Sequence, residues 1–287
     1  MIPSRRALIL GAGAASLTAT VRADAPDDGL ALTGRFVQGG FAMGRTWPRA
    51  LIFVDGEALT TASAAGLFVV GFDRDAPGTV QIEARDATRS ARRSLTIVPG
   101  QFASTRINGL PPSTVEPSDP ALLARIQQEV ALKVEGFASR TDTDDFRSGF
   151  IWPLDTRRVT SAWGAQRVLN GTPARPHYGI DLAAPAGTPI RAPADGLVTM
   201  ARTGLHFEGG LTLIDHGQGL VTACLHQSRI DVLPGQRVGR GDVIGRVGMT
   251  GRATGPHLCW RMRWRDRNLD PSLMIGQSAP PQGQRSA

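Results

Sequence analysis

Short apolar runs interrupted by glycine and proline fill the sequence from residue 149 to residue 275. None of them keeps the spacing of an amphipathic helix, whereas runs of about 4–8 residues between turn residues are typical of strands. The stretches RVTSAWG (158–164) and GLTLIDHGQGLVTACLHQS (210–228) show this pattern. The sequence therefore predicts an all-β domain over residues 149–275, and a domain of this size usually closes into a barrel or a sandwich.

Residues 30–100 show the same pattern of short apolar runs separated by turn residues, over a shorter stretch of sequence. Their apolar segments are ALIFV (50–54), LFVVGF (67–72), TVQIEA (79–84) and RSLTIV (93–98). Short strands at regular spacing predict a small β-sandwich. Because this region contains no cluster of titratable residues, we expect it to pack against or position the rest of the chain.

A linker and one helix are expected at residues 111–147. The proline-rich segment PPSTVEPSDP (111–120) reads as a linker, and Asp119 followed by Pro120 marks a helix start. Residues 276–287 are polar and rich in proline and glutamine, so we expect a disordered tail. The chain as a whole is expected to be mainly β, with a single connecting helix.

The N-terminus resembles an export signal. Arg5 and Arg6 precede a mild apolar stretch that ends in Ala23-Asp24-Ala25, a typical cleavage site, and the paired arginines resemble the twin-arginine type. We therefore expect residues 1–25 to be a signal peptide and the protein to be exported to the periplasm or cell envelope. An N-terminal membrane anchor stays open as an alternative. No later apolar stretch reaches the roughly 18 residues of a membrane span, so no stable membrane insertion is expected.

The formal charge of +7 comes almost wholly from arginine, since Lys133 is the only lysine. A basic protein can bind nucleic acid, but these arginines are scattered and are not interleaved with aromatic residues. We therefore expect no nucleic-acid partner. Attraction to an anionic bacterial envelope fits the charge equally well.

Five side chains of the C-terminal domain carry the chemistry. His177 stands four positions before Asp181, His257 stands two positions before Cys259, and His226 lies between these two segments. If the segments are strands, His257 and Cys259 share one face. A metal ion held by His177, Asp181 and Cys259, with the other two histidines beside it, would make a hydrolytic centre.

The motifs around these residues resemble the lysostaphin-type (LytM-like) zinc endopeptidases. The segments are HYGIDLAAP (177–185), LHQS (225–228) and TGPHLCW (254–260), in this order. The resemblance covers roughly residues 150–275. It implies an antiparallel β barrel-like core with a long substrate groove, one Zn²⁺ per chain, and cleavage of peptide cross-links in peptidoglycan. The layout resembles exported proteobacterial members with an N-terminal β domain.

The resemblance also implies roles for each position. His177 and Asp181 match the first two zinc ligands, and His226 and His257 match the two catalytic histidines. Cys259 stands where the family has its third ligand, a histidine. A thiolate is a competent zinc ligand but adds a second negative charge, so we expect a bound metal and weaker hydrolysis than with histidine.

Other residues leave alternatives open. Strand alternation would place Cys224 on the same side as His226, and a disulfide with Cys259 in an oxidising compartment would then inactivate the site. We expect His216, in a turn, to be structural. We expect His206 to lie in a loop near the groove.

Two other classes of function compete with hydrolysis. A weakened or inactive member could instead bind peptidoglycan or cell-wall amidases and regulate other envelope proteins. Biotinyl and lipoyl carrier domains share the glycine pattern of residues 235–245, but they need a lysine at a hairpin tip, whereas Lys133 lies in the helix. A phosphotransfer carrier would have to be cytoplasmic, which the export signal contradicts.

Overall fold

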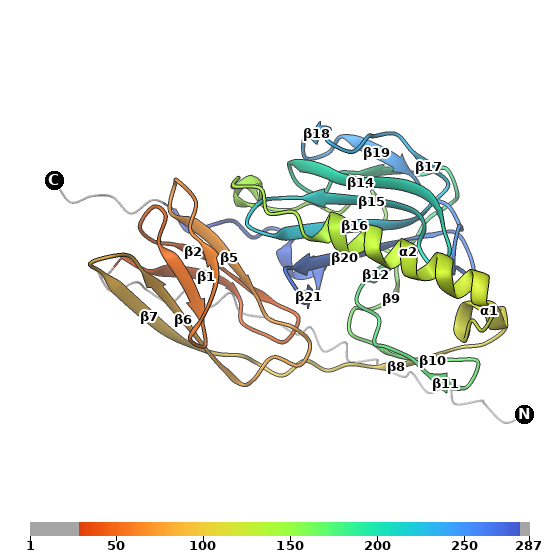
Figure 1. Cartoon of the computed structure of the whole chain (residues 1–287), viewed down its shortest axis with the longest axis horizontal. Helices are drawn as coiled ribbons and strands as arrows, with labels where there is room; N and C mark the ends of the chain where they lie inside the picture. Colours follow the sequence, from red (N-terminus) through yellow and green to blue (C-terminus); the bar gives the residue numbers. More distant parts are fainter. Residues whose placement is uncertain (1–28, 282–287) are drawn as a thin grey trace, which may run out of the picture.

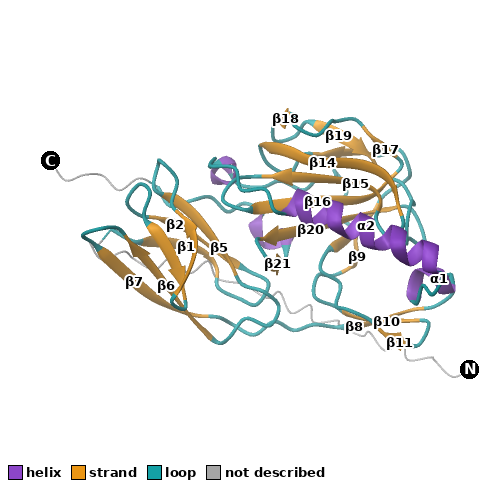
Figure 2. Ribbon diagram, in the orientation of Figure 1, coloured by secondary structure: helices purple, strands orange, loops and turns teal. Residues whose placement is uncertain are grey.

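The computed structural model describes residues 29–281, which form two β-rich lobes and one long helix (Figure 1). Strands make up most of the ordered elements (Figure 2), so the mainly β class expected from the sequence is confirmed. The predicted signal peptide (1–25) and residues 282–287 of the expected tail lie outside the described residues. Between residues 29 and 281, no helix has both the length and the apolar character needed to cross a bilayer.

Two antiparallel sheets form the N-terminal lobe. The three-stranded sheet has the order β1-β2-β5: Ala31–Arg35, Phe41–Arg45 and Leu67–Gly71. The four-stranded sheet has the order β4-β3-β6-β7: Glu57–Thr61, Leu51–Val54, Thr79–Arg85 and Ser90–Thr96. Side chains of both sheets, such as Leu32 and Ile82, belong to one buried apolar cluster. This is the two-layer arrangement of a β-sandwich.

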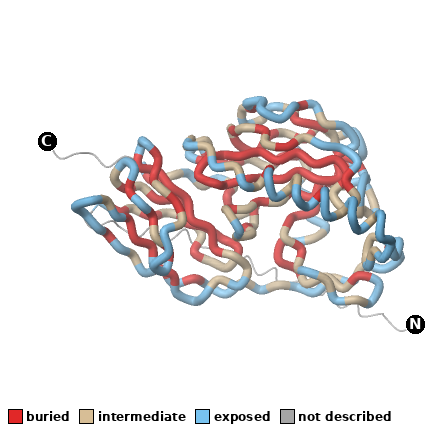
Figure 3. Tube along the Cα trace, in the orientation of Figure 1, coloured by how far each residue is buried: buried red, intermediate tan, exposed pale blue. Residues whose placement is uncertain are grey.

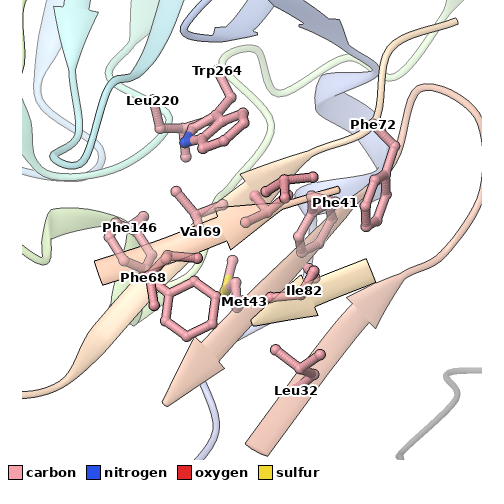
Figure 4. Close-up of a cluster of buried hydrophobic side chains, with 14 of the residues drawn as sticks. Leu32, Phe41, Met43, Phe68, Val69, Phe72, Ile82, Phe146, Leu220 and Trp264 are labelled. Carbon is pink, nitrogen blue, oxygen red and sulfur yellow. The ribbon is translucent and has the colours of Figure 1, made fainter. Parts of the chain in front are cut away.

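The buried cluster of the N-terminal lobe continues into the C-terminal lobe. Figure 4 shows Trp264 and Leu220 beside Val69 of β5, and all three belong to the same cluster. Gly71, at the end of β5, permits this close approach, because a Cβ there would lie 2.7 Å from Cδ2 of Leu269. The contact between the lobes is therefore an apolar core, which fixes the N-terminal lobe against the C-terminal sheet.

An eight-stranded antiparallel sheet builds the C-terminal lobe. Its order is β18-β14-β15-β16-β20-β12-β9, and β21 pairs with β20. In that order the strands span Arg237–Val238, Gly196–Leu205, Gly209–Asp215, Leu220–Gln227, His257–Trp264, Ile180–Ala183 and Val159–Ser161, with β21 at Arg267–Leu269. A second sheet contains β13 (Pro189–Arg191), β19 (Val243–Arg246) and β17 (Arg229–Ile230). The larger sheet is open at β18 and β9, so the antiparallel fold expected from the sequence forms without closing into a barrel.

The two faces of the large sheet differ in character. Leu258 and Trp260 of β20 enter an apolar cluster on one face. His257 and Cys259 alternate with them and point to the opposite face, and the strand register pairs Cys259 with Asp181 of β12. Figure 3 shows that the sheet is largely buried. Alternation along β20 therefore places His257 and Cys259 on one face of the sheet, with the apolar cluster packed against the other face.

Helix α2 (Pro120–Phe137) lies across the sheet on the face that carries Cys259 (Figure 1). It begins as the sequence predicts, with the side chain of Asp119 accepting a hydrogen bond of 2.7 Å from the amide of Leu122. Gly136 allows a close approach to β15, because a Cβ there would lie 2.7 Å from Cδ1 of Leu213. The helix thus covers part of the sheet next to the site.

Replacing Asp119 with alanine is expected to fray the first turn of α2. The substitution removes the acceptor of the Leu122 amide, and the loss of such a cap costs about 1 kcal/mol. Hydrogen exchange should therefore become faster at Leu122 while strand β15 keeps its protection. Asp119→Asn retains an acceptor oxygen and serves as the matched control. Unchanged exchange in the alanine variant would mean that packing alone fixes the helix start.

The connection between the two lobes contains regular structure both before the expected linker and within its proline-rich segment (111–120). Strand β8 (Ser104–Ile107) pairs in parallel with β10 (Gln166–Leu169), which also pairs with β11 (Thr172–Pro173). A short helix, α1 (Pro112–Val115), follows within the proline-rich segment. The chain between the two lobes is therefore attached to the C-terminal lobe before α2 begins.

Two short 3₁₀ helices complete the C-terminal lobe, η1 (Asp145–Ser148) and η2 (Pro271–Met274). After η2 the chain returns to the N-terminal lobe. Nε of Arg45 donates a hydrogen bond of 2.9 Å to the carbonyl of Pro280. Residues 276–281, the beginning of the expected tail, thus lie against the first sheet. The amino-acid composition of this segment did not predict that contact.

Candidate functional site

Three side chains converge at the junction of β12 and β20. Asp181 and Cys259 are paired directly by the strand register, and His177 lies just before β12. One donor atom from each residue lies within 4.8 Å of the other two. Nε2 of His177 is 3.1 Å from Oδ1 of Asp181 and 3.4 Å from Sγ of Cys259. The structure therefore brings together the three residues that the sequence analysis assigned as metal ligands.

The chemistry of these three donors fits a divalent metal ion. Oδ1 of Asp181 is buried and makes no well-aligned hydrogen bond among the described residues; its contact of 3.1 Å is to Nε2 of His177, another atom of the same donor set, and a metal ion would satisfy both. Nδ1 of His177 lies 3.1 Å from Oγ of Ser161, which directs Nε2 toward the carboxylate. A metal-binding histidine usually has such a partner on its other nitrogen. An imidazole, a carboxylate and a thiol in this arrangement form a suitable ligand set.

The local electrostatics hold Asp181 in its charged form. Burial alone would raise the pKa of Asp181, but the imidazole of His177 and the guanidinium of Arg167 lower it well below its usual range. Nη2 of Arg167 is 2.8 Å from Oδ2 of Asp181. Burial also opposes protonation of His177, yet the nearby Cys259 and Asp181 outweigh it and raise the pKa of His177. The negative donors thus attract positive charge to this point.

Arg261 supports the sulfur of Cys259. It lies two residues further along β20 on the same face, and its Nε donates a hydrogen bond of 3.4 Å to Sγ. Gly179 leaves room for this pair, because a Cβ there would lie 2.9 Å from the sulfur and 2.8 Å from Cγ of Arg261. A guanidinium in this position offsets the negative charge of a thiolate. Strand alternation is the sequence signal that could have identified Arg261.

His226 has an unusual backbone at the end of β16. Its φ of 65° lies in the left-handed region, which residues other than glycine rarely adopt, and His226 lies within the register shift between β15 and β16, which spans Cys224 to Gln227. Nδ1 lies 2.8 Å from the carbonyl oxygen of Thr250, so Nδ1 carries the proton and Nε2 is an acceptor. Burial lowers the pKa of His226 to about 4. A neutral imidazole of this kind can accept a proton.

His257 stands beside His226, with the ring centroids 4.7 Å apart and the planes at 48°. Its Nδ1 donates to the carbonyl oxygen of Gly255 at 2.8 Å, which leaves Nε2 3.7 Å from Oδ1 of Asp181. Burial is the main cause of its lowered pKa. Two neutral imidazoles therefore flank the three donor atoms, in the arrangement that the resemblance implied.

Cys224 and Cys259 are both free thiols, and they lie on opposite faces of the sheet. The strand register pairs Cys224 with Trp260, and it pairs Leu225 with Cys259. Directly opposite residues share a face, so Cys224 points into the apolar cluster away from the site. The expectation that Cys224 shares a side with His226 is not met, because the left-handed backbone of His226 interrupts the alternation. Burial raises the pKa of Cys224 to about 12.

The remaining histidines of the described residues take other positions. His216 is buried, with Nδ1 2.6 Å from the carbonyl oxygen of Asp195 and Nε2 2.8 Å from Oγ1 of Thr222. Both of its ring nitrogens are therefore used in fixing the turn. His206 lies in a loop, and its Nε2 is 3.1 Å from the carbonyl oxygen of Ser113 in the linker.

Residues 107–110, just before the expected linker, form part of one wall of the site. The converging residues open into a cavity of about 300 Å³, which Ile107 and Leu110 also line. Nδ2 of Asn170 donates to the carbonyl of Leu110 at 2.8 Å, and Nη1 of Arg252 donates to that of Thr114 at 3.0 Å. This role was not predicted, because the composition of a connecting segment does not indicate which strand it will pair with.

Comparison with known proteins identifies relatives of the same architecture. Residues 175–271 match the model of Peptidase family M23. A crystal structure from Pseudomonas aeruginosa, described as a peptidase M23, is 31% identical, with a TM-score of 0.64 over 84% of this chain and 95% of that chain. The match to the family model includes the three converging residues and both flanking histidines.

Two curated relatives match less than half of the chain. The peptidoglycan DD-endopeptidase ShyA of Vibrio cholerae is 41% identical over 122 residues, which is 42% of this chain and 28% of the relative. The DD-carboxypeptidase/endopeptidase Mpg of Neisseria meningitidis is 41% identical over 127 residues, 44% of this chain and 29% of the relative. The chain thus spans less than a third of the length of these relatives.

Proposed function

The chain belongs to peptidase family M23, as the resemblance to lysostaphin-type enzymes predicted, and we propose that it is a zinc-dependent endopeptidase that hydrolyses peptide cross-links of peptidoglycan in the cell envelope. The observation that carries this proposal is the buried convergence of donor atoms from His177, Asp181 and Cys259 within 4.8 Å. The names of ShyA and Mpg support the type of substrate and bond. The export signal expected at residues 1–25 would bring the protein to that substrate.

Three residues would hold the zinc ion: His177, Asp181 and Cys259. Bound zinc supplies a Lewis acid that polarises the scissile carbonyl and makes water a stronger nucleophile. Arg167 keeps Asp181 ionised through the 2.8 Å contact to Oδ2, and Oδ1 stays available as a ligand. Arg261 steadies the sulfur through its 3.4 Å hydrogen bond.

Two histidines would move protons and position the reacting groups. His226 presents an unprotonated Nε2, so it can take a proton from the attacking water. His257 also presents Nε2 to the site, and in its protonated form it could donate to the oxyanion or to the leaving amine. The 4.7 Å separation of the two rings lets both act on one peptide bond.

The competing function is regulation without hydrolysis. It rests on Cys259, which departs from the histidine expected of the family and whose charge could weaken the chemistry. Such a protein would bind peptidoglycan or an envelope partner through the same groove. The lowered pKa of both flanking histidines favours the enzyme. Neutral imidazoles can accept a proton during catalysis, whereas a site that only binds a ligand does not require them.

Metal analysis combined with digestion of purified peptidoglycan tests the proposal. We expect one zinc ion per chain and the release of uncross-linked muropeptides, detected by chromatography and mass spectrometry. A chelator should stop the digestion, and added zinc should restore it, because the ligands are protein side chains that rebind the metal. Zinc binding without muropeptide release would favour the regulator, and a protein that binds no zinc would contradict the proposal.

A further inference from the structure

A second, larger cavity adjoins the metal-ligand site. Its volume is about 820 Å³, within the range of ligand-binding cavities, and it lies between α2, β20 and the segment 174–178. Arg167, His177, Arg252 and Arg261 line both cavities. The two cavities therefore form one continuous groove, and the proton-accepting and metal-binding groups occupy one end of it.

The lining of this groove is strongly cationic. Six cationic side chains face three carboxylates across the two cavities; the cations are Lys133, Arg167, Arg175, Arg252, Arg261 and Arg263, and the carboxylates are Asp181, Glu208 and Asp266. Two carboxylates are already paired, Asp181 with Arg167 at 2.8 Å and Glu208 with Lys133 at 2.6 Å. The groove thus keeps an excess of positive charge after its own ion pairs have formed.

Two of the remaining arginines are partly buried and form no ion pair within 4.0 Å among the described residues, although carboxylates such as Asp266 lie farther off. Arg263 lies over the ring of Phe137, 4.8 Å from its centroid, and its Nε is buried without a hydrogen-bond partner. Arg252 donates to the carbonyl of Thr114 and lies 4.9 Å from the ring centroid of Phe207. Burial lowers the pKa of both arginines. Partly buried guanidinium groups that lack a direct ion pair are costly, and an anionic ligand in contact with them would offset that cost.

We propose that this cavity is a subsite for a carboxylate-bearing segment of the substrate, with Arg252 and Arg263 as its specificity-determining residues. The inference rests on the proposed function and assigns the recognition of a free substrate carboxylate to these two arginines. Val130, Val134 and Phe137 of α2 line the same cavity and give the aliphatic parts of such a segment an apolar surface.

The position of the cavity agrees with the chemistry of an acidic cross-link. In a D-alanyl–diaminopimelate link, the carbon that bears the scissile nitrogen also bears a free carboxylate. Cleavage at the metal site would therefore place a negative charge immediately beside it, where Arg252 lines both cavities. A glycine bridge has no charge at the corresponding position and would leave the arginines without an anion.

Cleavage of three synthetic cross-linked peptides tests the subsite. The first carries free carboxylates, the second has the same carboxylates converted to primary amides, and the third contains a glycine bridge. For the wild-type protein we expect kcat/KM to be at least about tenfold higher for the free acid than for the amide. Arg263→Gln and Arg252→Gln should each raise KM for the free acid about tenfold and leave the amide almost unchanged.

The control variant is Arg202→Gln, which removes an exposed arginine of β14 outside the lining of both cavities. Zinc content and melting temperature of each variant verify folding, and binding of the free-acid peptide to a His226→Ala background provides a readout without turnover. Equal cleavage of acid and amide by the wild type, or an equal loss for both in the arginine variants, would overturn the subsite while leaving the hydrolase intact. Cleavage of none of the three peptides would contradict the proposed function instead.

Discussion

His226→Ala is expected to lower the rate of peptidoglycan cleavage by about 10²–10⁴-fold, the usual contribution of a general acid or base. The metal content should not change, because His226 is not among the three residues whose donor atoms converge. Its imidazole is instead held by the carbonyl of Thr250, 2.8 Å from Nδ1, with Nε2 as an acceptor. The variant removes this acceptor and leaves the ligands in place.

The measurement pairs the initial rate of muropeptide release with zinc analysis of the same sample. His226→Gln fills a similar volume but cannot take up a proton at neutral pH, so it should be as inactive as the alanine variant. A decrease in zinc content in either variant would assign His226 to the ligands. Activity within a few-fold of the wild type would remove it from the proton-transfer role.

The depressed pKa of His226 sets the expected pH dependence. With a pKa of about 4, the ring stays neutral from alkaline pH down through the usual value of 6.5, and it becomes protonated only near pH 4. The proton acceptor is therefore preserved in mildly acidic solution, and its loss should appear as an acid limb below pH 5. A limb centred near pH 6.5 in the wild type would mean that the imidazole is more exposed to solvent than the fold indicates.

The alternation of side chains along a strand predicted part of the site correctly, but it failed at His226, whose backbone is strained. His257 and Cys259 share a face as expected, because β20 is regular over its eight residues. The same rule misplaced Cys224, since the left-handed backbone of His226 turns this side chain out of the alternation. Backbone strain of this kind depends on the packing of neighbouring segments, which a single sequence does not encode locally.

The long-range features of the groove had no sequence signal. Arg167 reaches Asp181 from β10, and Ile107 reaches the cavity because β8 pairs with β10. Both contacts depend on which strands become neighbours, whereas the motifs fix only the residues close to them in sequence. The fold class was predictable because turn residues and short apolar runs are local properties.

Cys259→Ala is expected to weaken zinc binding by more than about 100-fold, since even the loss of a residue that only supports a ligand costs about 10–100-fold. Competition with a chromophoric chelator would measure the change. Cys259→Ser is the matched control for size. It replaces the thiol by a hydroxyl, which is not a usual zinc ligand, and should bind zinc almost as weakly. Unchanged affinity in both variants would show that the sulfur, despite lying 3.4 Å from Nε2 of His177, is not a ligand.

Cys259→His is expected to raise the cleavage rate at matched zinc content, by about tenfold, or about 1.4 kcal/mol of the activation barrier. A neutral imidazole in place of the thiolate leaves the metal more positive and therefore a stronger Lewis acid. Arg261 complicates the single substitution, because its guanidinium now donates to the sulfur at 3.4 Å and would face an imidazole instead. The double variant with Arg261→Gln relieves that conflict and should be more active than the single variant. Equal or lower digestion by both would mean that the site is adapted to sulfur, with Arg261 withdrawing enough charge from the thiolate to preserve the chemistry.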